Sequence, residues 1–285
     1  MKLDNLSRRR VVGLLVAFFS SAALPANANS QPSLKVTAGD GSFDRIKAAG
    51  SLTFGTSNDQ PFCFLDPTTN QIAGIDAEIL LAILQKLDIP KHEVQQVDFD
   101  GLIPGLLASR MDVIADAMYV TPKRSEVVNF TNGWYQYGDA LVVRKGNPGN
   151  LHSLKDLPAG ASFGAQLGTV YADWLNEVGG IQVKVYPTVQ NILDDIKIGR
   201  LDGALVDAPV ASYLLQRDPS YAAAYEIVSD YQPKDIGIVA AGLRKEDLAL
   251  LEVVNWALNE IKRESKDLEI LQRWGLTERN RVAIG

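Results

Sequence analysis

The sequence predicts an α/β protein made of two similar units, and three observations support this class. Short apolar segments alternate with segments whose apolar residues recur at helical spacing, a pattern typical of a mostly parallel sheet flanked by helices. The alternation runs from residue 52 to residue 115 and starts again at residue 161. Extended segments at 140–144 and 237–243 follow the two units. They indicate two lobes joined by a pair of strands, although a single doubly wound domain fits the pattern as well.

The individual elements follow from the same periodicities. In the first unit we expect strands at 52–56, 94–97 and 113–115 and helices at 76–87 and 100–109. In the first of these helices, Ile79, Ile83 and Leu87 recur at the spacing that places side chains on one face. In the second unit we expect strands at 161–166, 181–186 and 203–206 and helices at 169–177, 189–198 and 209–216. A long amphipathic helix is expected to begin near Lys245.

The order of these elements divides the chain between the two lobes. Residues 34–140 and 240–285 are assigned to the first lobe, and residues 141–239 to the second. The chain is expected to cross between the lobes near 141–144 and again near 236–241.

Residues 1–28 have the features of an export signal. Three consecutive arginines ending at Arg10 precede an uncharged apolar segment at 11–24, and a small-x-small cleavage pattern ends at Ala28. The apolar segment is shorter than the roughly 20 residues that a membrane span needs. The arginines resemble a twin-arginine signal, and an ordinary secretory signal is the alternative. We therefore expect cleavage near Ala28 and a periplasmic protein.

Composition narrows the possible partners. The whole chain has a formal net charge of −6, and the basic leader contributes positive charge, so the exported chain is more acidic. An acidic chain without a basic stripe argues against binding to nucleic acid or to an anionic membrane. Cys63 is the only cysteine, so we expect a small buried hydrophobe rather than a disulfide. With His92 and His152 as the only histidines, we expect no metal and no cofactor, and we expect a monomer.

The segment from residue 111 to residue 131 is the most informative. A short apolar strand ends in Asp116, Ala117 and Tyr119, and ligands bind at the carboxyl ends of strands in open α/β sheets. Thr121-Pro122 then predicts a helix N-terminus, with Arg124 in the first turn. A guanidinium beside free backbone N–H groups can hold a carboxylate. An ordinary strand–turn–helix with a solvated arginine is the alternative.

This segment resembles the amino-acid class of bacterial periplasmic solute-binding proteins. That family has the pattern I-D-A-I, then T-x-x-R, then F-(S/T), which is matched here at residues 111–114, at Thr121 and Arg124, and at Phe130-Thr131. The resemblance extends from about residue 52 to about residue 274. It implies a two-lobed periplasmic binding fold of type II with two hinge strands, which closes on a solute and delivers it to the permease of an ABC importer.

The resemblance also implies where an amino acid would lie. Arg124 occupies the position that binds the ligand carboxylate, and Gly168-Thr169 matches a turn of the second lobe that helps to hold it. Asp207 ends a segment that resembles (I/L)-D-A-x-x-x-D and falls on the aspartate that binds the ammonium. Both charges need a partner, because an unpaired charge in a closed cleft costs several kcal/mol. A helix N-cap is the alternative role for Asp207.

Further positions are expected to shape the pocket around the ligand side chain. Phe62, Phe99 and Tyr119 could surround a cationic or ring-shaped group, with about 0.5–2 kcal/mol from each ring. Asp116 stands where the family usually has a small neutral residue, and together with Asp59 it would favour a positively charged group. The complete set of expected ligand-binding residues is Asp59, Phe62, Phe99, Asp116, Ala117, Tyr119, Arg124, Gln166, Gly168, Thr169 and Asp207.

The type of ligand remains open between two readings of these residues. The aromatic and acidic positions resemble the ectoine-binding branch of the family, whereas Asp207 indicates a free α-ammonium. The expected ligand is therefore a polar or cationic amino acid or an ectoine-like solute.

Two other roles compete with transport. A periplasmic enzyme of the same fold, of the dehydratase type, is one, although the sequence has no H-E-x-x-H or Cys/His pattern. A protein that presents its ligand to a chemoreceptor is the other, and it would use the same pocket.

Overall fold

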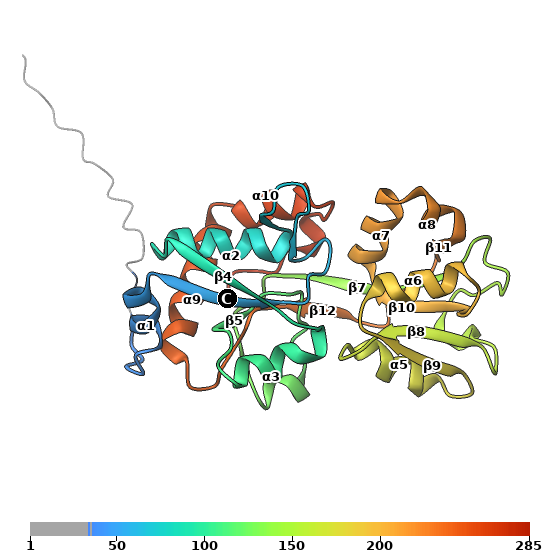
Figure 1. The fold of residues 1–285 in the computed structure, drawn as a ribbon, viewed down its shortest axis with the longest axis horizontal. Helices are drawn as coiled ribbons and strands as arrows, with labels where there is room; N and C mark the ends of the chain where they lie inside the picture. The colour runs from blue at the N-terminus through green and yellow to red at the C-terminus, as the bar shows by residue number, and fades with distance from the viewer. Residues whose placement is uncertain (1–33, 35) are drawn as a thin grey trace, which may run out of the picture. The chain divides into compact units, whose positions relative to one another are not determined.

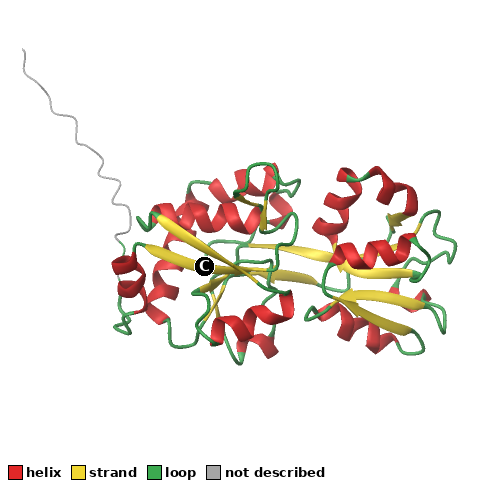
Figure 2. Cartoon of the chain, viewed as in Figure 1, coloured by secondary structure: helices red, strands yellow, loops and turns green. Residues whose placement is uncertain are grey.

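The computed structural model describes residue 34 and residues 36–285. The export signal predicted at residues 1–28 and its cleavage site lie outside the described residues. Leu34–Gly285 form one compact unit. Within it, helices cover two separate sheets, and two strands run from one sheet toward the other (Figures 1 and 2). The predicted α/β fold with two lobes is confirmed.

Lobe 1 is built on a five-stranded sheet with the strand order β4-β1-β5-β13-β6. Its strands are β1 (Ser51–Thr56), β4 (Lys91–Gln96), β5 (Val113–Ile114), β6 (Asn129–Phe130) and β13 (Gly242–Leu243), with a separate hairpin of β2 (Phe64–Leu65) and β3 (Ile72–Ala73). Its helices are α1 (Ser42–Ala49), α2 (Ile75–Lys86), η1 (Phe99–Gly101), α3 (Leu102–Leu107), α4 (Pro122–Ser125), α9 (Leu248–Arg263), α10 (Lys266–Arg273) and η3 (Glu278–Asn280).

Lobe 2 is built on the strand order β11-β7-β10-β8-β9. Its strands are β7 (Tyr135–Arg144), β8 (Ser162–Gln166), β9 (Gln182–Tyr186), β10 (Gly203–Asp207) and β11 (Tyr225–Ile227). Its helices are η2 (Leu154–Asp156), α5 (Val170–Val178), α6 (Val189–Lys197), α7 (Ala208–Arg217) and α8 (Pro219–Ala224). In both lobes the central pairs are parallel, β1 with β4 and β5, and β8 with β9 and β10. The carboxyl ends of the parallel strands lie at one edge of each sheet, and the loops that follow these strands gather there.

Two strands link the lobes. β7 pairs with β12 (Ile236–Val239) up to Gly138 and with β10 from Asp139 onward. Each crossing segment is therefore held in a β-ladder, which fixes the direction in which the chain leaves a lobe. β7 begins at Tyr135, before the extended segment expected at 140–144. The residue boundaries that we assigned to the lobes stay a prediction.

Most expected elements are present, with shifts of one to a few residues at their ends. The long helix expected from Lys245 begins instead at Leu248, because Arg244 and Asp247 form a buried ion pair in the preceding turn. It also divides into α9 and α10, since Ser265 has a φ of 56° and breaks the helical backbone. Cys63 is fully buried, as predicted.

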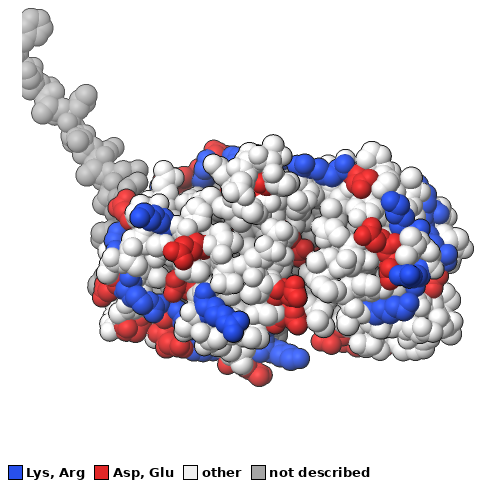
Figure 3. Space-filling model, viewed as in Figure 1, with Lys and Arg blue, Asp and Glu red and all other residues white. Residues whose placement is uncertain are grey.

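The surface and the helices add two observations. On the face drawn in Figure 3, lysines and arginines are interspersed with acidic side chains. Among the described residues, no helix has both the length and the apolar character to cross a membrane.

Candidate ligand-binding site

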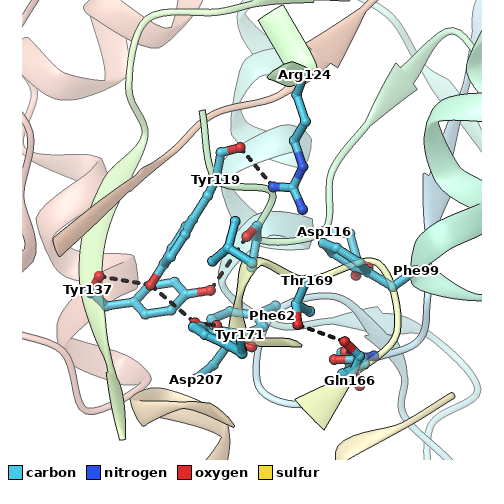
Figure 4. Close-up of a pocket in the computed structure, with 13 residues that line it drawn as sticks. Phe62, Phe99, Asp116, Tyr119, Arg124, Tyr137, Gln166, Thr169, Tyr171 and Asp207 are labelled. Carbon is cyan, nitrogen blue, oxygen red and sulfur yellow. Dashed lines mark hydrogen bonds between the residues drawn. The ribbon is translucent and has the colours of Figure 1, made fainter. Parts of the chain in front are cut away.

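A cavity lies between the two lobes, and side chains from both of them line it (Figure 4). We call it the interlobe cavity. The lining residues are Asp59, Phe62, Phe99, Asp116, Ala117, Tyr119, Arg124, Tyr137, Gln166, Thr169, Val170, Tyr171 and Asp207. Ten of the eleven residues expected at the ligand are in this set. The remaining one, Gly168, contacts Arg124 through its carbonyl oxygen.

The topology explains why these residues meet. Asp116 follows β5, Thr169 follows β8 and Asp207 ends β10, so all three lie at carboxyl ends of strands. This is the edge at which α/β sheets place their ligand-binding loops. Phe99 opens η1 after β4 and reaches the same edge from the neighbouring strand.

Arg124 is positioned by a short helix. The Thr121 side chain accepts a hydrogen bond from the Arg124 N–H at 3.2 Å, which caps α4. The guanidinium then donates to the carbonyl oxygens of Tyr119 at 2.8 Å and of Gly168 at 3.0 Å, and it lies 5.4 Å from the centre of the Phe99 ring. Burial lowers the pKa of Arg124. The alternative of a solvated arginine is wrong, because this side chain extends into the cavity and reaches the other lobe.

Asp207 occupies the N-cap position of α7. Its side chain makes no capping hydrogen bond to the helix. Its carboxylate instead accepts a short hydrogen bond from the Tyr171 hydroxyl, and the residue is 8% exposed. Burial raises the pKa of Asp207, and hydrogen bonds from Tyr171 and Tyr137 oppose that rise. Its side chain therefore does not cap the helix, and its role at the ligand ammonium stays a prediction.

Two further carboxylates lie together on the lobe 1 side. Asp116 accepts hydrogen bonds from the Thr56 hydroxyl at 2.8 Å and from the Ser57 N–H at 2.9 Å. Asp59 accepts one from the Gln166 amide of lobe 2 at 3.0 Å. Burial raises the pKa of both carboxyls, and the charge of Asp116 adds to the rise at Asp59.

The backbone of Ala117 depends on a residue that the sequence did not single out. Ala117 has a φ of 49°, a left-handed conformation that non-glycine residues rarely adopt. Asp76, at the start of α2, accepts a short hydrogen bond from the Ala117 N–H and a second from the Tyr135 hydroxyl at 2.6 Å. Asp76 is 1% exposed, and burial raises its pKa to about 7.

The aromatic rings are arranged differently from the expected cage. Tyr137 contacts both Phe62 and Tyr119, with ring centres at 5.3 Å and 4.9 Å, while Phe99 faces Arg124. A cage formed by Phe62, Phe99 and Tyr119 around a ligand stays a prediction.

Sequence reasoning missed Tyr137, Val170 and Tyr171, which also line the cavity. Tyr171 lies in the first turn of the helix after Thr169, and this position was the available signal for it.

Hydrogen bonds between residues of the described part of the chain cross the cavity from one lobe to the other. Among them are those that join Arg124 to Gly168, Gln166 to Asp59 and Tyr171 to Tyr119, so the lobes are closed on each other. A polar cavity that two lobes enclose, beside two connecting strands, defines the class of two-lobed solute-binding proteins.

Comparison with known proteins gives the family. The model of the bacterial extracellular solute-binding proteins, family 3, matches residues 52–277, and the chain belongs to this family. The L-cystine-binding protein TcyJ of Escherichia coli (strain K12) is 26% identical over 275 residues, which cover 96% of this chain and 97% of that protein.

Two solved structures are similar over most of the described chain. An ancestral arginine-binding protein bound to arginine has a TM-score of 0.72 at 32% identity, and covers 79% of this chain and 98% of its own. The ancestral amino acid-binding protein AncCDT-1, a precursor of cyclohexadienyl dehydratase, has a TM-score of 0.73 at 26% identity, and covers 81% of this chain and 98% of its own. The family and these relatives assign the chain to the solute-binding proteins of ABC transporters.

Proposed function

We propose that this protein binds an amino acid or an amino-acid-derived zwitterion in the periplasm, closes around it, and delivers it to an ABC permease as a monomer. The proposal includes removal of the leader near Ala28. The ligand class comprises polar and cationic amino acids and ectoine-like solutes. Relatives whose names describe binding of cystine and of arginine support an amino acid as the core of this class.

The position of Arg124 is the observation that supports this proposal most strongly. Its guanidinium lies in the interlobe cavity and donates to a carbonyl oxygen of each lobe, Tyr119 and Gly168. A ligand carboxylate is a stronger acceptor than a carbonyl oxygen and can accept two parallel hydrogen bonds from arginine. We infer that the ligand carboxylate replaces the Gly168 carbonyl oxygen as an acceptor of the Arg124 guanidinium. The carboxylate would then lie between the two lobes.

The second charge of the ligand would be matched from the other lobe. Asp207 is buried, lines the same cavity, and accepts hydrogen bonds from the hydroxyls of Tyr171 and Tyr137. An α-ammonium would supply the missing positive charge. Because Arg124 belongs to lobe 1 and Asp207 to lobe 2, one zwitterion contacts both lobes only when they are closed. This differential contact is what a ligand needs in order to shift the population toward the closed form.

The test is the response to ligand of Arg124→Ala compared with Lys123→Ala, its exposed neighbour on α4. Thermal shifts are measured with amino acids, betaines and ectoines. A ligand at 1,000 times its Kd adds about 4 kcal/mol to the stability of the wild type. Truncating one partner of a buried charge pair costs about 2–5 kcal/mol, so Arg124→Ala should weaken binding at least about 30-fold. Equal binding by the two variants would contradict the proposed pose.

Catalysis at the same site is the second candidate. Buried carboxyls with a raised pKa, such as Asp59 and Asp116, can act as general acids, and one structural neighbour is a precursor of a dehydratase. We propose binding without conversion. Incubation of the purified protein with each bound solute, followed by mass spectrometry, should return the solute unchanged; a dehydrated product would favour the enzyme.

A further inference from the structure

We propose that the hydroxyl groups of Tyr119 and Tyr171 form a hydrogen bond between the lobes that depends on the ligand, and we call this bond the tyrosine latch. Binding of the ligand ammonium to Asp207 turns the Tyr171 hydroxyl from that carboxylate to Tyr119, and the resulting bond holds the lobes closed. The inference rests on the proposed function, in which Asp207 binds the α-ammonium. It makes both tyrosines positioning residues for closure.

Tyr119 is held against the two crossing strands. Its hydroxyl donates to the carbonyl oxygen of Tyr137 on β7 at 2.9 Å. Its ring lies against Gly237 of β12, where a Cβ atom would come within 2.4 Å of the ring carbons. Gly237 is paired directly with Tyr137 in the ladder, so the side chain contacts both members of one residue pair of the connecting strands. The Tyr119 hydroxyl oxygen therefore has a fixed position.

Tyr171 reaches this oxygen from lobe 2. Its hydroxyl lies 3.4 Å from the Tyr119 hydroxyl and makes a short hydrogen bond to Asp207 (Figure 4). A hydroxyl has a single proton to donate, so Tyr171 can donate fully to only one of these two acceptors. Because the Tyr119 proton is directed at the Tyr137 carbonyl oxygen, the Tyr119 oxygen faces Tyr171 as an acceptor. The shorter bond assigns the Tyr171 proton to Asp207 in this structure.

The ligand changes the balance between the two acceptors. A hydrogen bond to an ionised carboxylate is charge-assisted and about twice as strong as one between neutral groups. An α-ammonium brings three donors and a positive charge to Asp207, so the bond from Tyr171 loses much of this advantage. The Tyr171 hydroxyl can then rotate about its C–O bond toward Tyr119. No proton leaves its oxygen, and only the direction of one O–H bond changes.

This rotation converts ligand binding into a contact between the lobes. Tyr171 belongs to α5 of lobe 2, whereas Tyr119 belongs to lobe 1. Both side chains are buried, and their rings meet edge to face with centres 6.4 Å apart, so water competes little for the bond. A bond that forms only after Asp207 is occupied stabilises the closed form more with the ligand than without it. This difference favours closure of the ligand-bound protein.

A double-mutant cycle measures the tyrosine latch. Tyr119→Phe and Tyr171→Phe each remove one hydroxyl and keep the ring, and a double variant removes both. Isothermal titration calorimetry gives the Kd of the best zwitterion of the panel for these three variants and the wild type. A hydrogen bond of ordinary net strength corresponds to about five-fold in affinity, and either single change removes it. The product of the two single-variant Kd values should therefore exceed the product of the wild-type and double-variant values about five-fold.

Two further measurements separate the latch from a purely structural role. The same cycle on the free energy of unfolding without ligand should show no coupling, because Tyr171 then donates to Asp207. In stopped-flow experiments, Tyr119→Phe should release the ligand about five-fold faster and associate with it at the wild-type rate. The matched control is Tyr186→Phe, which removes a hydroxyl that donates to Asp195 within lobe 2 at 2.7 Å. It should bind like the wild type.

The outcomes distinguish the latch from the proposed function. If the wild type binds a zwitterion but the effects of the two substitutions on Kd are additive, the latch is refuted and the proposed function stands. Equal coupling with and without ligand refutes the dependence on the ligand in the same way. If no zwitterion of the panel binds to the wild type, both are refuted.

Discussion

Tyr213 is expected to control ligand affinity although it lies outside the interlobe cavity. It belongs to α7 of lobe 2, and its ring centre is 6.2 Å from that of Trp274 and 6.5 Å from that of Phe64, both in lobe 1. Tyr213 and Trp274 line a second cavity, and Tyr137 lines both this cavity and the interlobe cavity. These ring contacts are formed in the closed arrangement, so they should stabilise it.

The magnitude follows from the geometry. An aromatic pair contributes about 0.5–1.5 kcal/mol at centroid distances of about 4.5–7 Å. The two distances here are at the long end of that range, so about 0.5 kcal/mol for each pair, or about 1 kcal/mol in total, is appropriate. Loss of that energy from the closed state lowers its population relative to the open state about five-fold. If the free protein is mostly open, the apparent Kd of Tyr213→Ala rises by the same factor.

Isothermal titration calorimetry with the best ligand of the panel measures this change. Tyr213→Phe retains the ring and should bind like the wild type, because the Tyr213 hydroxyl makes no hydrogen bond to any described residue. Tyr221→Ala removes a ring that contacts Tyr225 inside lobe 2, and should lower stability without changing affinity. If Tyr213→Ala binds as tightly as the wild type, or more tightly, the ring contacts do not stabilise closure and the reasoning is wrong.

Two further predictions concern Asp76. Asp76→Ala removes the hydrogen-bond acceptor of the Ala117 N–H and of the Tyr135 hydroxyl, so the free energy of unfolding should fall by about 2–4 kcal/mol. Urea denaturation measures this free energy, and a value within about 0.5 kcal/mol of the wild type would contradict this role. The second prediction is a pH dependence. Folded Asp76 has a pKa of about 7 against an ordinary value of 3.8, so the folded state binds more protons than the unfolded state between these values, and the Asp76 contribution should decrease as the pH rises from about 4 to about 7. We therefore expect the melting temperature to fall less steeply with pH for Asp76→Asn than for the wild type across this range. Equal slopes for the two proteins would refute the assignment.

The sequence was sufficient to predict the parts of the fold that depend on local pattern. α2 and β1 were predicted because their apolar residues repeat at the helical and strand periods, and these residues are buried in the structure. The break between α9 and α10 was not predicted. It depends on the left-handed backbone of Ser265, and no glycine or proline marks that position.

The site was predictable where residues follow a strand and less so elsewhere. Asp116 and Asp207 could be located because they lie at strand ends, and Arg124 because a helix N-terminus and a family pattern coincide there. Tyr137 lies near the start of the crossing strand β7, where no strand end or family pattern marks it, and it still lines the cavity. Asp76 resembles an ordinary acidic residue in the first turn of a helix, and its bond to Ala117 spans 41 positions of sequence.

The exchange of partners along β7 determines where the two halves of the protein can rotate. Gly138 is the last residue of β7 that pairs with β12, and Asp139 is the first that pairs with β10. Rotation of the backbone between Gly138 and Asp139 changes the relative orientation of the two ladders without breaking a hydrogen bond of either. A Cβ atom at Gly138 would approach Pro233 to within 2.6 Å, so any larger residue would push the two connecting segments apart. The pivot of the molecule therefore requires glycine for reasons of space, even though no ligand atom needs to come near it.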